Sequence, residues 1–506
     1  MKKQGWTRAL GALALAGGMA MVYGCGGGGS STTKEPTPAI QNVNSSTTPT
    51  SPVGLPIEIN GSGFQSAPGK VTFVQGNVSV DVTPAASAWS DTGIVATMPT
   101  GNGTTTFTTP GTVQVTVSTS GGTSNAVTVN LVPTLNFVPS AMGWSTTMPL
   151  PKPMTGMAAV GVPGATVGTA FSVITGGFDG TANTTTVWAN NLNVDGTVGS
   201  TTNTNWTTIA ATQLPGTLAF HAMAEADPTN SLVSSSQRFV YVLGGQVNTT
   251  DQMGTNTVYM ASVDATTGAV GTWTSLSTTL PQSLFGLAAT VHNGYLYVAG
   301  GVNTNGVTVN TVYSAAVHSD GTLGSWTTAT NALPTPRAFG TMFVFGGVVY
   351  YINGYSSGSA APNDQIVGDT NVYYASAIRG TVGAWTQNGN STIHDRAKGI
   401  LFTAYGQVIS GEGVYTGNGT AGSGEMETTT INANNTGNVA LNSWNGLTGS
   451  LGQTPKANVY NAAGFTSPLV TATYAPRFLI LGGQAQTGTT GPGGALSSTV
   501  YYNNLP

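Results

Sequence analysis

The sequence predicts an all-β protein, on three observations. Short runs of alternating apolar and polar residues are separated by turn residues along most of the chain. Glycine is frequent, at 71 of 506 residues, as expected where many tight turns join short strands. From residue 136 to the end, one strand-rich pattern returns every 53 to 67 residues, each time with a tryptophan.

The composition excludes several classes of partner and structure. Charged residues make up 6% of the chain, and the net charge is −4, whereas an ordinary soluble domain has about 25% charged residues. No basic cluster occurs beyond the extreme N-terminus, so we expect no nucleic-acid partner. Coiled coils and charge-rich disordered chains are excluded for the same reason, while 39% hydrophobic residues are enough to form a core.

The N-terminus predicts secretion. Residues 1–24 combine a positively charged start with an apolar stretch of 14 residues at 9–22, shorter than the roughly 20 residues that span a bilayer comfortably. This stretch leads into residues 22–25 (VYGC), which resemble a bacterial lipobox and imply lipidation of Cys25. Cys25 is the only cysteine, so no internal disulfide can form.

Residues 25–36 are expected to form a flexible tether of glycine, serine and threonine behind the lipidated cysteine. The lipid would hold the protein on a membrane without a spanning helix. The lipoprotein resemblance, with Gly26 after the cysteine, implies the bacterial outer membrane. The cell surface and the periplasmic face both remain open.

Residues 37–133 are expected to form a small β-sandwich, because several short alternating strands are separated by turn residues. Three segments resemble the IPT/TIG family of immunoglobulin-like domains: 59–64 (INGSGF), 89–99 (WSDTGIVATMP) and 124–127 (SNAV). In bacterial surface proteins such domains usually act as spacers, which is the role that the resemblance implies here.

Residues 136–506 contain a repeat with one tryptophan per copy. A clear copy has an apolar strand ending in two glycines at 295–301 (YLYVAGG), then 311–314 (TVYS) and 320–326 (DGTLGSW). In the fifth copy the pattern is weakest, with Ser410-Gly411 expected in place of the glycine pair and Thr428-Thr429 in place of the Val-aromatic pair. Four short strands per unit are typical of a propeller blade.

The two ends of the repeat complement each other. The last copy stops near residue 506 without a tryptophan, while Trp144 has no preceding strands of its own. We therefore expect the strand around Trp144 to be the outer strand of a sixth blade, which closes the ring. The pattern resembles kelch repeats, as in six-bladed kelch propellers and the central domain of galactose oxidase.

Kelch-type enzymes have their sites at the mouth of the central channel, on loops that lead into the innermost strand of each blade. A galactose oxidase site would need a cysteine in the propeller, which this chain lacks. We expect no cofactor and no metal, because the four histidines lie in different copies without paired spacing. The expected mouth positions are Met154, Leu218, Leu284, Arg337, Arg396 and Asn458.

Two of these positions are cationic, and Arg337 and Arg396 are candidate ligand-binding residues for a carboxylate or an acidic sugar. They could instead be solvated loop charges. If the protein is an enzyme, His394, Asp395 and Glu412 are the candidate catalytic residues.

Three functions remain open. The residues favour a non-enzymatic, lipid-anchored binding or scaffold protein of the cell envelope that recognises a glycan or another protein. The alternative is a sugar-processing kelch enzyme, similar to epimerases or mutarotases, with its site at the channel mouth. A purely structural surface component is the third. We expect a monomer, because a closed ring leaves no sheet edge to pair.

Overall fold

The computed structural model describes most of the chain after residue 33, and residues from Pro36 onward form one compact unit. The predicted signal peptide and Cys25 lie outside the described residues. The residues described are 34–44, 49–132, 143–166, 168–199, 206, 209, 211–226, 237–248, 253–356, 369–404, 406–415, 426–431, 439–447, 459–468, 477–485 and 494–504.

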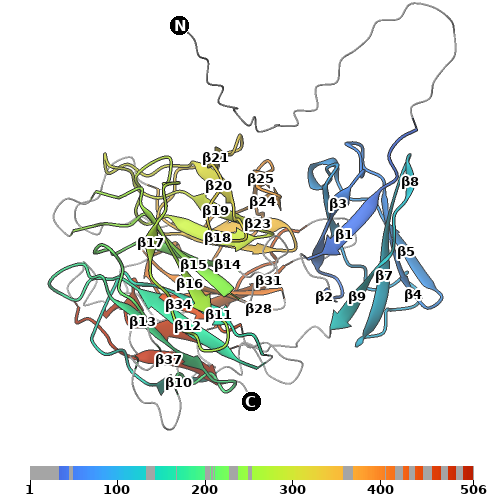
Figure 1. The fold of residues 1–506 in the computed structure, drawn as a ribbon. Helices are drawn as coiled ribbons and strands as arrows, with labels where there is room; N and C mark the ends of the chain where they lie inside the picture. The colour runs from blue at the N-terminus through green and yellow to red at the C-terminus, as the bar shows by residue number, and fades with distance from the viewer. Residues whose placement is uncertain are drawn as a thin grey trace, which may run out of the picture. The chain divides into compact units, whose positions relative to one another are not determined.

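The described chain is almost entirely β-structure (Figure 1). Its single helical element is η1, a 3-10 turn at Ala86–Ala88. Within the described part of the chain, no helix has the length and apolar character needed to cross a bilayer. The all-β class predicted from the sequence is therefore correct.

Residues 39–132 form two sheets that pack around one core (Figure 1). One sheet has the order β1 (Ala39–Val43), β3 (Pro56–Ser62), β6 (Gly93–Thr97). The other has the order β2 (Thr50–Pro52), β9 (Val127–Val132), β7 (Gly111–Thr119), β4 (Lys70–Gln75), β5 (Val78–Val82), with β8 (Gly122–Thr123) paired to β7.

The core between these sheets explains the INGSGF segment. Gly63 adopts φ 70°, which turns the chain so that Phe64 is fully buried beneath it. Trp89 packs edge-on against Phe64 and donates its indole N–H to the Phe64 carbonyl over 3.0 Å. The two aromatic residues therefore satisfy a buried polar group while they fill the core.

Residues 143–504 form six larger sheets, each antiparallel, counted over the described residues. Five follow the chain order: β11 (Ala158–Pro163), β12 (Ala170–Thr175), β13 (Val187–Leu192); β14 (Ala222–Ala226), β15 (Gln237–Leu243), β16 (Val258–Asp264), β17 (Thr274–Ser275); β18 (Ala288–His292), β19 (Tyr295–Ala299), β20 (Val312–Ala316), β21 (Thr327–Thr328); β22 (Thr341–Phe345), β23 (Val348–Ile352), β24 (Val372–Ile378), β25 (Thr381–Val382), with β26 (Thr386–Gln387) on β24; and β28 (Ile400–Ala404), β29 (Gln407–Gly411), β31 (Met426–Thr430), β32 (Asn445–Gly446).

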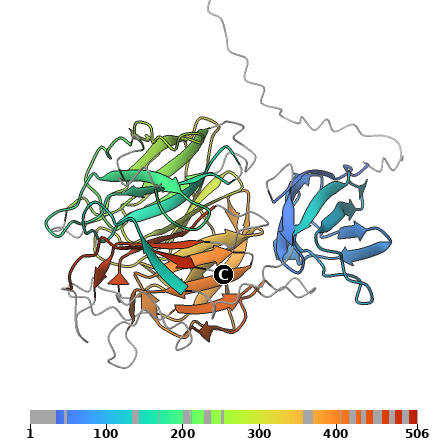
Figure 2. The same cartoon turned by 90° about the horizontal axis from the view of Figure 1, so that it is seen from below.

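The sixth sheet joins the two ends of the repeat. Its order is β34 (Ala463–Thr466), β35 (Phe478–Leu481), β37 (Val500–Asn504) and then β10 (Gly143–Thr147). Trp144 of β10 lies opposite Asn503 of β37, as the incomplete ends of the repeat predict. Figures 1 and 2 show the red C-terminal strands beside the green strands that begin the repeat.

Two-stranded pairs link the loops between the sheets. They are β27 (Arg396–Ala397) with β30 (Val414–Tyr415), and β33 (Val459–Tyr460) with β36 (Gln484–Ala485). The second strand of each larger sheet is apolar and buried along most of its length, for example β23 and β35. Such strands are covered on both faces by neighbouring sheets.

The inner strands are tied together by a closed ring of backbone hydrogen bonds. Six residues, each two positions before an inner strand, donate N–H to the carbonyl of the equivalent residue in the preceding repeat. These bonds are Phe220 to Gly156 (2.8 Å), Gly286 to Phe220 (2.9 Å), Phe339 to Gly286 (2.7 Å), Lys398 to Phe339 (3.0 Å), Asn461 to Lys398 (3.0 Å) and Gly156 to Asn461 (2.9 Å). The arrangement is propeller-like, with the inner strands around a common channel.

A second ring of bonds surrounds the first. Each repeat has a glycine pair, or two other residues in its place, after its second strand. The second residue of this pair donates its N–H to a carbonyl of the next repeat. The pairs are Gly177 with Leu218, Gly245 with Leu284, Gly301 with Arg337, Gly354 with Arg396, Gly413 with Val459, and Gly483 with Met154. In the last repeat the equivalent position is therefore Val459, and the expected Asn458 is wrong by one residue.

The same register corrects two assignments in the fifth repeat. Glu412 and Gly413 adopt φ 51° and 92° and occupy the glycine-pair positions, not Ser410-Gly411. Gly411 pairs with Met426, just as Leu243 pairs with Val258 in the second sheet. Met426 and Glu427 therefore replace the Val-aromatic pair, not Thr428-Thr429. Glycines stand on both sides of Glu412, so the sequence did not show which of them belongs to the pair; backbone pairing defines the register.

The closing strand gives a first prediction. Trp144 is buried, with 6% of its surface exposed, and its ring centroid lies 6.3 Å from that of Phe402. Trp144→Ala should lower the free energy of unfolding by about 3–5 kcal/mol, because it leaves a large cavity where the two chain ends meet. Urea denaturation measures this loss. Trp326→Ala, at a half-buried equivalent position, is the control; equal losses for both variants would contradict a special role for Trp144.

Candidate functional site

The structure buries both candidate arginines. Arg337 is 0% exposed and Arg396 is 1% exposed. They occupy the repeat position that holds Met154, Leu218, Leu284 and Val459 elsewhere, all of them buried apolar residues. The arginines are thus neither solvated loop charges nor side chains open at a channel mouth, because their position in the repeat faces the packed layer between sheets.

Each guanidinium has partners inside the protein. Arg337 forms an ion pair with Asp369, lies over the Tyr373 ring at 5.5 Å and donates to the Tyr373 hydroxyl over 3.3 Å. Arg396 donates to Glu427 Oε1 over 3.3 Å and to the Glu412 carbonyl over 2.8 Å. A ligand carboxylate could reach either arginine only by displacing one of these groups.

The three candidate catalytic residues surround Arg396. His394 Nδ1 lies 3.4 Å from the Arg396 guanidinium, and Asp395 is half-buried beside it in the sequence. Glu412 is buried, and its Oε2 accepts the Val459 N–H over 3.1 Å. Burial raises the pKa of Glu412 to about 8, against the lowering effects of this hydrogen bond and of the Arg396 charge.

The central channel itself carries few titratable groups. A cavity of about 360 Å³ lies between the inner strands, lined by small and apolar residues together with His221 and a few threonines. His221 is buried and its Nε2 lies 2.8 Å from the Thr175 hydroxyl. Burial lowers the pKa of His221 to about 4, so the ring is neutral at ordinary pH.

A second cavity, of about 140 Å³, opens at the hydrogen-bonded ring. We call the six ring residues 156, 220, 286, 339, 398 and 461 the collar. All six adopt left-handed backbone conformations, with φ between 51° and 63°. Glycine adopts such angles freely and occupies two of the positions, but phenylalanine, lysine and asparagine occupy the other four at an energetic cost.

The side chains of the collar lie over one another. A Cβ on Gly156 would lie 2.7 Å from the Phe220 ring, and a Cβ on Gly286 would lie 2.6 Å from the Phe339 ring. Lys398 Nζ lies 5.1 Å from the Phe339 ring centroid. Phe220 and Phe339 are half-buried, with ring centroids 6.0 Å apart. The collar therefore presents aromatic surface and one ammonium group at the cavity.

Sequence reasoning missed the collar by two residues. The predicted mouth positions, such as Arg337, are followed two residues later by the collar residues, such as Phe339. A signal was present, since each collar residue lies two positions before an inner strand. However, Gly, Phe, Lys and Asn share no side-chain property, and only the left-handed backbone unites them.

The other end of the inner strands contacts the two-sheet region of residues 39–132. Glu58 of β3 is fully buried and forms an ion pair with His292, at the turn between β18 and β19. Asn293 donates to Glu58 Oε1 and to Asn60 Oδ1, each over 2.9 Å. Both oxygens of the buried Glu58 carboxyl group thus have hydrogen-bond partners, as burial of a polar group requires.

Neighbouring turns approach the same region closely. A Cβ on Gly346, between β22 and β23, would lie 2.2 Å from the Pro56 carbonyl oxygen. A Cβ on Gly406, between β28 and β29, would lie 2.6 Å from Leu55. These turns follow the inner strands, whereas the collar precedes them. The collar is therefore at the opposite end from the docked sheets, one five-residue strand away.

Among the described residues, no group of three or more His, Cys, Asp or Glu side chains could hold a metal ion. The sequence matches no protein-family model and no curated protein. Among solved structures, the chain is similar to one titled "Structure of YjhT", at 16% sequence identity and a TM-score of 0.42. The match covers 70% of this chain and 97% of that chain.

Two buried carboxyls predict how stability depends on pH. Burial raises the pKa of Glu225, as of Glu412, to about 8 from 4.5. Both folded-state carboxyls keep their protons where the unfolded chain has lost them, so stability falls as pH rises toward 8. His221 acts oppositely, but only below its unfolded pKa of 6.5.

Between pH 6.5 and 8 we therefore expect the free energy of unfolding to fall by about 1.5 kcal/mol for each carboxyl. Urea denaturation across this range checks the slope. Glu225→Gln and Glu412→Gln should each flatten it, because an amide has no proton to lose. A slope unchanged in both variants would show that these carboxyls are not responsible.

Proposed function

We propose that the chain is a lipid-anchored binding protein of the bacterial cell envelope that recognises a glycan at the collar. In this proposal, residues 1–24 are a signal peptide, Cys25 is lipidated and residues 25–36 are the tether. The N-terminal lipid then attaches the protein to one face of the outer membrane. The apolar stretch at 9–22 and the single cysteine support this part.

We assign residues 37–133 to an IPT/TIG-type sandwich and 136–506 to a six-bladed kelch-like propeller. Two sheets around one core, with Phe64 beneath the turn at Gly63, support the first assignment. Six sheets, and two rings of six hydrogen bonds each that join successive repeats, support the propeller assignment. Because β10 pairs with β37, the two ends of the repeat region share one sheet, and a ring closed in this way favours a monomer.

The collar is the main support for the proposed recognition of a glycan. Bulky and polar side chains occupy four left-handed positions where glycine would cost nothing, and such strain is concentrated at functional sites. Phe220 and Phe339 are half-buried and line the cavity, so they offer aromatic surface for packing against the apolar face of a sugar ring. Lys398 and Asn461 add polar groups at the rim of the cavity.

The docked sandwich suits this role. It lies against the turns at one end of the inner strands, so the collar at the other end is left for a ligand. Because Glu58 and Asn60 of the sandwich hydrogen-bond with His292 and Asn293, we expect the sandwich to hold the propeller in a fixed position.

One observation favours the alternative, a sugar-processing enzyme. Burial raises the pKa of Glu412 to about 8, the range of a general acid, and its carbonyl accepts from Arg396, which also contacts His394. The carboxyl oxygen Oε1 of Glu412 is buried without a hydrogen-bond partner. The channel cavities weigh against this alternative, because their linings contain only His221 and Lys398 as ionisable residues. Turnover of a bound sugar that Glu412→Gln abolishes would favour the enzyme.

The collar gives a prediction for binding. Phe339→Gly and Lys398→Gly keep the backbone in a conformation that glycine adopts freely, as at Gly156 and Gly286. Each variant should therefore fold and should weaken binding to a glycan panel at least tenfold, about 1.4 kcal/mol. Array screening followed by calorimetry measures the loss.

Arg379→Gly is the matched control, because Arg379 is also a cation at a left-handed position (φ 45°) but lies in the turn between β24 and β25. It should leave glycan binding unchanged. Binding that survives both collar substitutions would contradict a site at the collar. No glycan binding by the unmodified protein would contradict the glycan proposal and favour an envelope protein as partner.

A further inference from the structure

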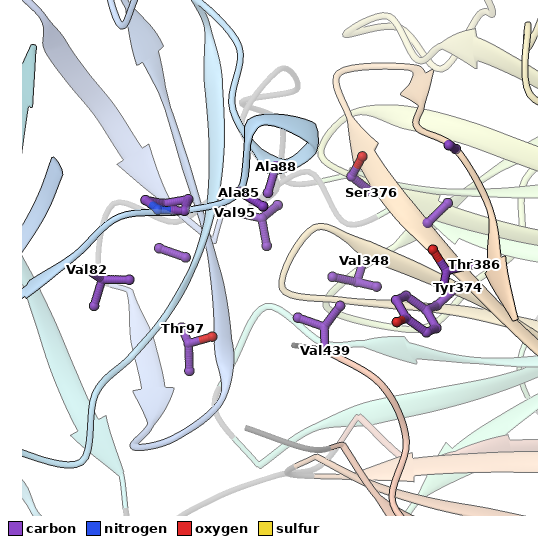
Figure 3. A pocket seen from close by; sticks show the side chains of 14 residues that line it. Val82, Ala85, Ala88, Val95, Thr97, Val348, Tyr374, Ser376, Thr386 and Val439 are labelled. Atoms are coloured by element: carbon purple, nitrogen blue, oxygen red, sulfur yellow. The ribbon is translucent and has the colours of Figure 1, made fainter. Parts of the chain in front are cut away.

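A cleft of about 210 Å³ lies between the sheets of residues 39–132 and the fourth of the larger sheets (Figure 3). Figure 3 shows Val95 and Thr97 on one wall, opposite Val348, Tyr374 and Val439. The cleft is at the far end of the molecule's inner strands from the collar, since Val348 follows the turn after β22. It is therefore distinct from the proposed glycan site.

The cleft does not result from loose docking, because glycines next to it lie in close contact with side chains of the opposite wall. A Cβ on Gly347 would lie 2.6 Å from Val95 Cγ2. A Cβ on Gly93 would lie 2.3 Å from Ile378 Cγ2. Only glycine fits at either position without movement, so the two surfaces are closely packed at these two points.

Small residues keep the cleft open. Five alanines line it, and larger apolar side chains at these positions would fill it. The alanines are Ala85, Ala88, Ala96, Ala375 and Ala384. A hollow that is bounded by close packing and lined by alanine from both sides is a formed site, and ligand pockets occur preferentially at such domain interfaces.

The walls define the chemistry of the occupant. None of the lining residues carries a charge, so an ion would lose its hydration without gaining a partner. The polar side chains in the lining are the hydroxyls of Thr97, Ser376, Thr386 and Tyr374. The volume exceeds the roughly 150 Å³ that holds benzene in other proteins but is below that of pockets for drug-sized ligands.

We propose that this cleft binds a small uncharged molecule made of one apolar ring with a hydroxyl group. The ring packs between the valines of the two walls, and the hydroxyl group lies toward the side-chain hydroxyls. Such a ligand contacts the sandwich and the propeller together, so its binding stabilises their docked arrangement.

Benzyl alcohol is the test probe, with benzoate and benzylamine as analogues of matched size that carry a negative or a positive charge. Titration calorimetry and ligand-observed NMR on the full chain should show benzyl alcohol bound at least tenfold more tightly than either ion. Equal affinities for all three, or no detectable binding of benzyl alcohol, would overturn the proposal.

Cleft-filling variants locate the binding. Ala88→Leu narrows the cleft from the sandwich side and Ala384→Leu from the propeller side, so each should reduce benzyl alcohol binding at least tenfold. Ala289→Leu is the control, because it adds the same volume to the central channel instead. Thermal melting identifies any variant that does not fold. If one of the two cleft variants fails to fold, the variant on the other wall provides the test. Unchanged binding in a folded cleft variant, or a loss in Ala289→Leu alone, would overturn the proposal.

This test is independent of the collar. Phe339→Gly and Lys398→Gly should bind benzyl alcohol like the unmodified protein, because neither residue lines the cleft. Loss of glycan binding with retention of benzyl alcohol would thus separate the two sites.

Discussion

The closed ring of backbone hydrogen bonds at the collar is the constraint on which the rest of the structure depends. Each bond joins one repeat to the next, and the bond from Gly156 to Asn461 joins the first to the last. A ring of this kind forms only if every inner strand begins at the same level, so it sets the register of all six sheets. The left-handed backbone at each position is the geometric cost of closure.

Closure also explains why the six repeats of this chain can have different side chains at the collar. Backbone groups make the ring bonds, so any side chain that tolerates the left-handed conformation can occupy a collar position. Aromatic and polar residues are found at four of the six, facing a cavity. The fold thus provides a fixed circle of positions at which side chains can change without loss of the ring, which is a suitable basis for recognition.

The fourth and fifth repeats show a second kind of variation, inside the packed layer. Arginine replaces an apolar residue in both, and each arginine meets the residue at the aromatic position of its own repeat: Tyr373 for Arg337 and Glu427 for Arg396. Paired replacement of this kind gives each buried guanidinium a polar partner within its own repeat. The same two repeats also supply turns that contact Pro56 and Leu55, so the least regular repeats adjoin the sheets of residues 39–132.

The sequence by itself determined the all-β class, the repeat, its closing strand at Trp144 and the exclusion of a cysteine-based copper site, because strand periodicity, residue spacing and composition are local properties. The tertiary structure decided the rest. It placed Arg337 and Arg396 in the interior, moved the fifth glycine pair to Glu412-Gly413, brought the collar together from six distant segments and joined Glu58 to His292. These features arise from contacts between residues far apart in the chain, and no pattern within one repeat encodes which distant groups will surround a side chain.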